Sequence, residues 1–321
     1  MKPAHFTLTE SGEFAPTPFA QSHWGDDHLS GPAVVGLAAR TLERDCGSTD
    51  FMPTRLTVDL FRAARGVPAA VAVRVVRDGR RIRSAECDVA QEGRLMARAT
   101  LLQYRRSAAP PGRLWAAPMT FPPLPSFDEA ALTQVGSDGG ARSQSPGEHQ
   151  NEFRKQFYNR ALDVVAGEEN SHFVRAVMVA EATSLVTNMG TQGIGYINGD
   201  LTVGLARLPV GEWIGVQGDS HWASDGVAVG TATLFDEAGA FGTGMTTAVS
   251  NPAAQIDFTN DPFPLRIVSL GLRGASRDAR SERHRELAQP GHARVAEVCV
   301  DTVEVDLVIG NSVENRPHHH L

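Results

Sequence analysis

The chain has 321 residues, of which 41% are hydrophobic and 21% charged, and its formal net charge at pH 7 is −7. This composition is ordinary for a globular protein. The acidic balance argues against nucleic acid as the main partner, because phosphate binding needs a basic surface. No apolar run approaches the roughly 20 residues of a membrane-spanning helix. The first residues also lack the apolar stretch of a secretory signal, so we expect a cytoplasmic protein.

The cysteines Cys46, Cys87 and Cys299 are odd in number and scattered along the chain. They form neither a disulfide framework nor a zinc-binding pattern, which is typical of a reducing compartment. The glycine-rich segment 190–199 follows an expected helix and opens a strand, the reverse of the dinucleotide-binding order. A G-x-S-x-G nucleophile motif does not occur in the sequence. We therefore expect no metal and no cofactor.

The first regular element in chain order is a helix that begins near Pro32 and ends near Gly47. Proline suits the first helical turn, and four apolar residues between 34 and 42 fall on one face. Alternating apolar residues then predict strands over 56–60 and 71–75. Asp78-Gly79 predicts a type I′ hairpin turn, because that turn needs positive φ at both central residues.

The same pattern returns about 145 residues later. LTVDLFR at 56–62 is matched by LTVGLAR at 201–207, and a turn glycine, an Asp-Gly pair and a Glu with a nearby Gly follow both in the same order. Asp225-Gly226 is the second predicted hairpin turn. The second copy is preceded by a helical segment with Ser171 as its N-cap and Gly190 at its end.

This ordered repeat indicates a duplicated unit, each copy being one helix followed by an antiparallel meander. A single helix wrapped by such a sheet is the hotdog architecture, so we expect an α+β double hotdog. The two units should form a pseudo-dimer with their sheets joined edge to edge into one antiparallel sheet, which removes two exposed edges.

We expect a first hotdog over residues 1–106, a Pro/Ser/Gly-rich linker over 107–150 and a second hotdog over 151–254. The start of the linker is expected to pack through Trp115 and Phe121, and its later part to be a loop. Residues 255–321 have no counterpart in the first copy and should be dispensable for folding. They hold a charged stretch at 273–286, expected to be solvated, and a strand-like run at 295–310.

Two segments carry a resemblance to a known family. Residues 195–244 contain the string DLTV…P-x-GEW…DG…L-x-DE-x-G, and the first half contains HWGDDHLSGPAVVGLAARTLE and PTRLTVDLFR. These segments resemble the two hotdogs of actinobacterial thioesterase-family proteins, which are similar to bacterial acyl-CoA thioesterase II. The resemblance covers most of residues 10–250. It implies hydrolysis of acyl-CoA to free acid and CoA by an activated water.

In acyl-CoA thioesterase II the polar residues at the site are an Asp on the second helix, a Thr on the next strand and a Gln on the last strand. The resemblance places them at Glu181, Asn198 and Thr246, each a different residue type here, with Asp200 two residues after Asn198. A carboxylate with polar partners can hold and deprotonate water. The structural alternatives are a polar helix face for Glu181, a turn for Asn198, and ordinary strand positions for Thr246 and Asp200.

Substrate contacts are expected at the start of the first helix. Relatives have a His-Gly-Gly-Pro-like turn where this chain has Leu29-Ser30-Gly31-Pro32, with His28 one place early. Gly31 could donate its N–H to the thioester oxygen at the helix N-terminus, the alternative being ordinary capping. His28 could equally be a surface residue. The arginines between 77 and 83 would meet the phosphates of CoA or form a solvated hairpin tip.

The main hypothesis is therefore an acyl-CoA thioesterase of lipid metabolism, with acyl-CoA as its partner and a homo-oligomer possible. One alternative is a non-catalytic acyl or acyl-CoA binding protein, which the changed residue types favour. The other is a hotdog hydratase or dehydratase. That chemistry needs an Asp/His pair, and the second unit offers only His172 near its helix start.

Overall fold

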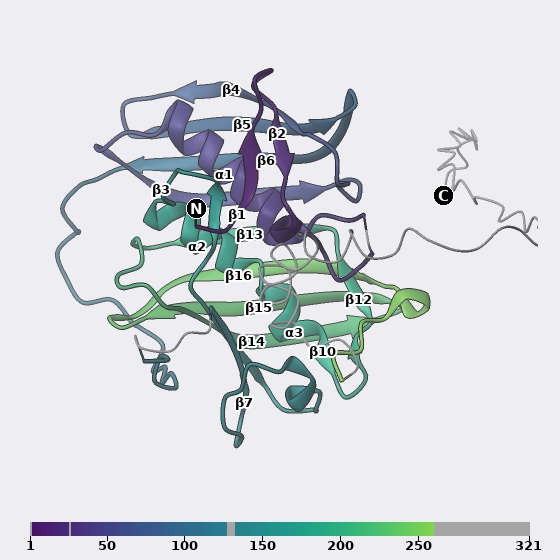
Figure 1. Cartoon of the computed structure of the whole chain (residues 1–321). Coiled ribbons are helices and arrows are strands. Elements are labelled where there is room, and N and C mark those ends of the chain that lie inside the picture. The colour runs from purple at the N-terminus through teal and green to yellow at the C-terminus, as the bar shows by residue number, and fades with distance from the viewer. Residues whose placement is uncertain (1, 26, 127–131, 260–321) are drawn as a thin grey trace, which may run out of the picture. The chain divides into compact units, whose positions relative to one another are not determined.

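One antiparallel sheet of 11 strands dominates the computed structural model, which describes residues 2–25, 27–126 and 132–259 (Figure 1). Its order is β4-β5-β6-β3-β13-β16-β15-β14-β8-β7, and β12 pairs with β16 beside β13. The strands of this sheet are β3 (Phe51–Leu60), β4 (Ala70–Asp78), β5 (Ile82–Gln91), β6 (Arg94–Arg105), β7 (Thr133–Ser137), β8 (Lys155–Asn159), β12 (Tyr196–Asn198), β13 (Asp200–Leu205), β14 (Ile214–Ser224), β15 (Val227–Asp236) and β16 (Gly239–Ser250).

The two copies of the repeated motif meet at the centre of this sheet. Strand β3 pairs with β13 in antiparallel fashion, and Thr57 lies opposite Thr202, its counterpart in the repeat. Because equivalent residues face each other, an approximate twofold axis passes through this pair. The strand order on the two sides is then the same, β3-β6-β5-β4 and β13-β16-β15-β14. The α+β double hotdog with edge-to-edge sheets is confirmed.

Three α-helices pack against one face of the sheet: α1 (Gly31–Cys46), α2 (His172–Ala180) and α3 (Thr183–Asn188) (Figure 1). The apolar face expected on the first helix is buried, with Leu37 and Leu42 fully enclosed. Ser171 caps α2 as expected, since its side chain accepts the N–H of Val174. The helices and the sheet enclose one large apolar core between them.

The second helical segment differs from the single helix that the sequence predicts. It breaks after Ala180, where the N–H of Ala182 bonds to the carbonyl of Val179 at 3.1 Å instead of continuing the α-helical pattern. Neither glycine nor proline marks this point, so sequence rules for helix ends do not find it. The break falls at Glu181, which is the C-cap of α2.

The tight turns agree only in part with those predicted from the sequence. Asp225 and Gly226 have φ of 52° and 75°, as a type I′ turn requires. At Asp78-Gly79 the expected hairpin is present between β4 and β5, but the type I′ turn is wrong, because neither residue has positive φ and the loop is longer. The turn with two positive φ values in the first unit is Glu92-Gly93, at 50° and 74°.

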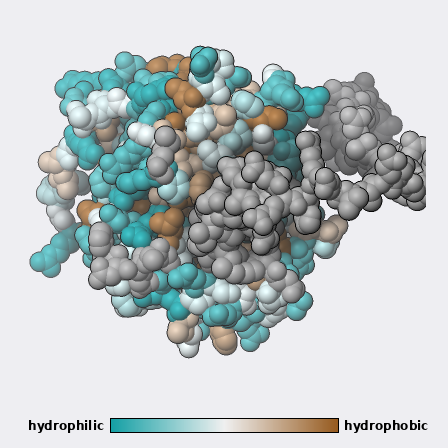
Figure 2. All heavy atoms as spheres, viewed as in Figure 1, coloured by the Kyte–Doolittle hydropathy of each residue, from teal (hydrophilic) through white to brown (hydrophobic). Residues whose placement is uncertain are grey.

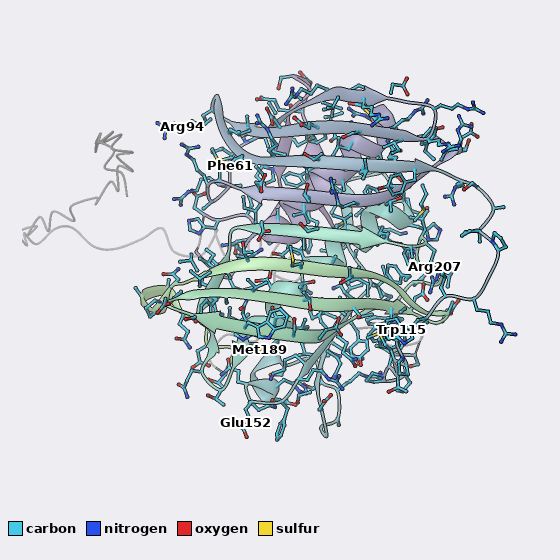
Figure 3. All side chains as sticks on the ribbon, turned by 180° about the vertical axis from the view of Figure 1, so that it is seen from behind. Phe61, Arg94, Trp115, Glu152, Met189 and Arg207 are labelled. Carbon is cyan, nitrogen blue, oxygen red and sulfur yellow. The ribbon has the colours of Figure 1, made fainter. Side chains whose placement is uncertain are left out.

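The later part of residues 107–150, expected to be a loop, contains the edge strand β7, which pairs with β8, and the helix η2 (Pro146–His149), so that expectation is wrong. The first part of the segment follows β6. Phe121 stacks on Phe235 with 4.4 Å between ring centroids, and with Leu124 it covers a small cluster around Tyr158 and Trp213, as the sequence suggests for Phe121. The prediction for Trp115 is wrong, because its side chain is 85% exposed (Figure 3). Apolar groups on the face shown in Figure 2 otherwise occur in small, separate groups among hydrophilic residues.

Smaller elements connect the N-terminal strands to the second unit. Strand β1 (Ala4–Leu8) pairs with β2 (Phe14–Pro16) and, in parallel, with β9 (Asp163–Val165). The remaining short elements are β10 (Met189–Gly190), β11 (Gly193–Ile194) and the 3₁₀ helices η1 (Pro18–Ala20), η2 (Pro146–His149) and η3 (Pro252–Ala254).

The packed chain continues past the boundary expected at residue 254. Ile256 exchanges two backbone hydrogen bonds with Ile194, at 2.9 and 3.0 Å. Phe258 is only 2% exposed, and its N–H donates to the side chain of Gln150 at 2.6 Å. The charged stretch at 273–286, the run at 295–310 and Cys299 lie outside the described residues.

These contacts predict that residues 253–259 stabilise the fold. Burial of a phenylalanine side chain is worth about 2 kcal/mol, or roughly 4 °C or more in melting temperature for a chain of this size. A chain ending at Pro252 should therefore melt lower than a chain ending at Thr259, as measured by differential scanning calorimetry. Phe258→Ala in the chain ending at Thr259 should lower the melting temperature in the same direction. Equal melting temperatures for all three would contradict the assignment of this segment to the core.

Candidate active site

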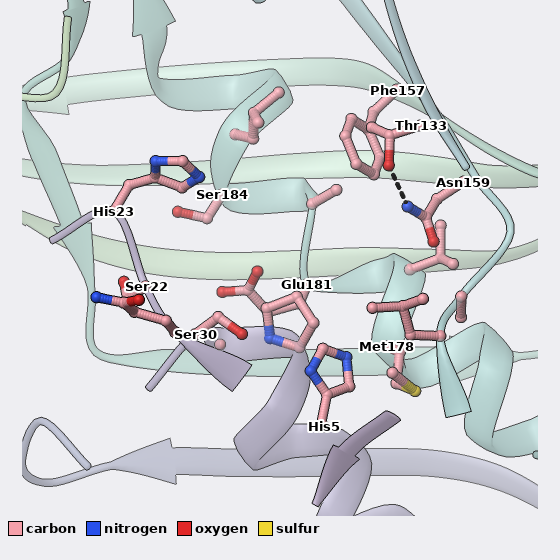
Figure 4. A pocket seen from close by; sticks show the side chains of 18 of the residues that line it. His5, Ser22, His23, Ser30, Thr133, Phe157, Asn159, Met178, Glu181 and Ser184 are labelled. Atoms are coloured by element: carbon pink, nitrogen blue, oxygen red, sulfur yellow. Dashed lines mark hydrogen bonds between the residues drawn. The ribbon is translucent and has the colours of Figure 1, made fainter. Parts of the chain in front are cut away.

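A cavity lies where the start of α1, the break between α2 and α3, and strand β8 come together (Figure 4). Its walls come from segments far apart in the sequence, including the N-terminal hairpin and the segment that follows β16. Most of these side chains are apolar, and Glu181 stands near the middle. Lining residues include His5, Phe19, Ser22, His23, Trp24, Ser30, Gly31, Pro32, Leu132, Thr133, Phe157, Asn159, Arg160, Leu162, Met178, Val179, Glu181, Ser184, Leu185, Ile194, Asn198, Ile256 and Phe258.

The helix break sets the position of Glu181. Its carboxylate lies directly against the α-carbon of Gly31, so closely that a side chain at position 31 would overlap it. Gly31 is the first residue of α1, where backbone N–H groups lack helical partners and the helix dipole is positive. The glycine therefore allows a carboxylate of the second unit to reach the helix N-terminus of the first.

Asn198 is the second polar group at this point. Its Nδ2 donates to Oε1 of Glu181 at 3.3 Å and to the backbone oxygen of Asp200 at 3.4 Å. The second contact fixes the orientation of the amide, and the first directs it at the carboxylate. The structure thus brings together three of the residues predicted from the sequence: Glu181, Asn198 and Gly31.

Burial controls the proton affinity of Glu181. Removal from water raises the pKa of this carboxyl from 4.5 to about 7, and the hydrogen bond from Asn198 acts in the opposite direction. A carboxyl group in this range exists in both protonation states near neutral pH. That property suits a group that accepts and returns a proton.

The other two predicted polar residues lie outside this arrangement. Asp200 accepts a hydrogen bond from Thr247 Oγ1 at 2.7 Å and does not line the cavity. Its side chain joins neighbouring strands on the sheet face away from the helices, because Leu201 next to it is the buried residue. Thr246 is fully buried, its hydroxyl has no hydrogen-bond partner, and it also does not line the cavity. Neither prediction gains support from the geometry.

His28 is likewise absent from the cavity wall. Its backbone forms an isolated antiparallel β-bridge with Arg65. Burial, together with the positive charge of Arg65, lowers the pKa of the His28 imidazole. The arginine cluster of the β4–β5 hairpin is separate from the cavity as well. Arg83 there pairs with Asp78 at 2.6 Å and lies over the Phe51 ring.

Several cavity residues were not found from the sequence. His23 and Ser184 lie on one side of Glu181, and Phe157 and Asn159 on the other (Figure 4). Asn159 donates to Thr133 Oγ1 at 2.8 Å. The Nδ1–H of His5 donates to the carbonyl of Phe19, 2.9 Å away. Burial lowers the pKa of His5 to about 4, so the ring is neutral at pH 7. These residues meet only through the fold. His23 opens the quoted segment at 23–43, but nothing in that segment distinguishes it as a cavity residue.

The approximate twofold axis relates the site at the start of α1 to an equivalent site at the start of α2. Ser30 and Ser171 are the two N-caps, and Arg40 follows the first by ten residues as Glu181 follows the second. Arg40 donates to Glu168 through Nε at 2.8 Å, and Ser171 bonds to Glu43. The equivalent site at the start of α2 thus contains an ion pair, whereas the cavity at the start of α1 contains Glu181 and Gly31. The two halves have therefore diverged in chemistry while keeping one fold.

Comparison with known proteins defines the class of the chain. Residues 20–103 match the acyl-CoA thioesterase N-terminal domain and residues 111–249 the acyl-CoA thioesterase C-terminal domain. The chain belongs to this acyl-CoA thioesterase family, whose members are thioester hydrolases as a class. No curated protein sequence matches the chain.

Solved structures support the fold at low sequence identity. Acyl-CoA thioesterase II TesB2 from Mycobacterium marinum has a TM-score of 0.53 and 16% identity over 77% of this chain and 94% of that one. The tesB protein of Mycobacterium avium subspecies paratuberculosis has a TM-score of 0.51 and 15% identity over 70% and 88%. A conserved hot dog protein of unknown function from Alicyclobacillus acidocaldarius has a TM-score of 0.54 and 13% identity over 75% and 92%.

Two further observations concern the described residues alone. None of their helices combines the length and apolar character of a membrane-spanning segment. Within residues 2–25, 27–126 and 132–259, His, Cys, Asp and Glu side chains do not gather in threes that could hold a metal ion.

The raised pKa of Glu181 predicts a dependence of stability on pH. Because the folded state holds the proton more tightly than the unfolded state, this group costs no stability below pH 4.5 and an increasing amount as the pH rises through 7. Glu181→Gln removes that cost. The variant should melt above the parent at pH 8 by several degrees, and this advantage should disappear at pH 4.5. Thermal melts at the two pH values measure it.

Glu237→Gln is the matched control, because that side chain is exposed and lies away from the cavity. It should leave the melting temperature unchanged at both pH values. If the melting temperature of Glu181→Gln differed from that of the parent by the same amount at pH 4.5 and pH 8, the raised pKa of Glu181 would be contradicted.

Proposed function

We propose that this chain hydrolyses acyl-CoA thioesters to the free acid and CoA, using a water molecule that Glu181 orients and deprotonates. The observation that carries the proposal is the position of the Glu181 carboxylate. It is half-buried in a cavity whose lining is mostly apolar, its pKa is raised to about 7, and it lies against the first residue of α1. Membership of the acyl-CoA thioesterase family supplies the substrate class.

The reaction requires one base and one site for negative charge. Glu181 accepts a proton from water as the oxygen attacks the thioester carbonyl, giving a tetrahedral oxyanion. The start of α1 at Gly31 is suited to that charge, because its N–H groups and its helix dipole are positive. When the carbon–sulfur bond breaks, the proton held by Glu181 returns to the departing thiolate. Glutamate is thereby regenerated.

Asn198 has a positioning part in this scheme. Its amide holds one carboxylate oxygen of Glu181 at 3.3 Å and leaves the other available to water. The same bond favours the charged carboxylate and so limits the rise of its pKa. Thr246 and Asp200 have no part in the proposed reaction, because neither reaches the cavity.

The two alternative functions, a non-catalytic binding protein and a hydratase or dehydratase, predict different results in acyl-CoA assays. An acyl or acyl-CoA binding protein would bind the ligand without releasing CoA. For a hydratase or dehydratase, the expected histidine His172 contacts Arg175 at 3.0 Å and is not in the cavity wall, whereas His5 and His23 are. Hydration of an enoyl-CoA without thiol release would favour that reading.

A cytoplasmic location and a role in lipid metabolism belong to the same proposal. Cys46 and Cys87 are free thiols, and Cys87 lies in the core, where burial raises its pKa to about 12. Unpaired cysteines are typical of proteins in a reducing compartment. Acyl-CoA substrates are consistent with that location.

Substitution of the base gives a direct test. Glu181→Gln preserves the shape and removes the carboxylate, so the rate of CoA release should fall about 10²- to 10⁴-fold, the usual contribution of a general base. Glu181→Asp keeps the carboxylate and should retain more activity than the glutamine variant. Free-thiol release from a panel of acyl-CoA chain lengths measures both. Wild-type rates in Glu181→Gln would show that another group is the base.

The pH dependence of the rate gives an independent test. The base acts when deprotonated, so kcat/KM should rise with pH and level off above a midpoint near the pKa of Glu181, about 7. Glu181→Gln should lose this midpoint and show only the slow background hydrolysis. A rate that falls as the pH rises from 6 to 8 would be inconsistent with Glu181 as the base.

A further inference from the structure

The segment that follows the last strand forms one end of the cavity. Ile256 and Phe258 both line it, although they lie beyond the duplicated unit. The Phe258 ring meets the His23 ring edge to face, with 6.3 Å between centroids and 68° between planes. The backbone of the segment is fixed by Ile194 and Gln150. An ordered wall, not a loose end of the chain, therefore bounds the cavity here.

The two ends of the cavity differ in character. At one end Phe258 and Ile194 are well packed, at 2% and 7% exposed, and the His23 ring lies against Phe258. On the opposite side of Glu181 the wall includes Phe157 and Asn159 (Figure 4). Arg160, the next residue after Asn159, also lines the cavity.

Arg160 also lines a second hollow of mixed charge, where Lys2 and Arg175 lie among Asp163, Glu169 and Glu212, and it pairs with Glu212 at 3.6 Å. The Phe258 side therefore offers the more apolar surface to an acyl chain.

We propose that Phe258, with Ile256 and Ile194, closes the acyl end of the cavity and sets the longest acyl chain that the protein accepts. This inference rests on the proposed function, and it adds the direction of the substrate and the residues that determine specificity. The acyl chain points toward Phe258, and the CoA moiety leaves past Arg160. Each methylene that fits is favoured by burial, whereas one that meets the Phe258 ring is excluded.

The physical reason lies in the packing of Phe258. A closed wall of well-packed side chains gives way only at a cost, so chain length is limited sharply rather than gradually. Phe258→Ala would open a space of about one phenyl ring at the end of the cavity. Ile256→Trp would fill space on the same side. The two substitutions should therefore shift the accepted chain length in opposite directions.

The experiment measures dissociation constants for a series of saturated acyl-CoAs of increasing length by isothermal titration calorimetry. All variants carry Glu181→Gln, so binding is read without turnover. The parent affinity should rise with length and then fall at a limit. Phe258→Ala should move that limit to longer chains, with affinity gains of about 10-fold or more for the chains that newly fit. Ile256→Trp should move it to shorter ones.

Phe241→Ala is the control, because Phe241 is equally buried at 2% exposed but does not line the cavity. It should lower the melting temperature and leave the chain-length limit in place. An unchanged limit in Phe258→Ala, or affinity independent of length in the parent, would overturn the inference. Chain-length-dependent binding without CoA release by the protein carrying Glu181 would contradict the hydrolase proposal and leave the acyl-end assignment standing.

Discussion

The pairing of β3 with β13 is the constraint on which the rest of the structure depends. It joins the two halves at residues that are equivalent in the repeat, Thr57 and Thr202, and so fixes an approximate twofold relation between the helices above the sheet. Under that relation α1 and α2 come into contact, and the start of α1 lies beside the end of α2. The meeting of Gly31 with Glu181 follows from the register of two strands on which neither residue lies.

The cavity combines two costs that a protein core normally avoids. A carboxyl group is withdrawn from water, and a helix terminus is left without a side-chain cap, since Ser30 makes no capping hydrogen bond. The two are complementary, because the positive helix end and the carboxylate lie against each other. Bound substrate would bring a carbonyl oxygen into the same field. Polar groups that are costly in the empty protein are thus oriented before the ligand arrives.

The sequence predicted the fold well because its evidence is periodic and repeated. The motifs at 56–62 and 201–207, the N-cap at Ser171 and the Asp225-Gly226 turn are local signals, and each has its expected structure. The candidate site was predicted only in part. Glu181, Asn198 and Gly31 meet, whereas Asp200 and Thr246 sit on strands whose side-chain direction depends on register. His5, His23 and Phe258 reach the cavity through tertiary packing, for which the sequence has no local signal.

The ion pair of Arg40 with Glu168 bears on how a protein made of two fused hotdog units can evolve. In a dimer of identical subunits every substitution appears twice, so a change that suits one active site is forced on the other. Fusion of the two units into one chain removes that coupling. One half can then replace the groups at its helix start by an ion pair, while the other keeps a half-buried carboxyl group. Under the proposed function, the expected stoichiometry is one site for each chain.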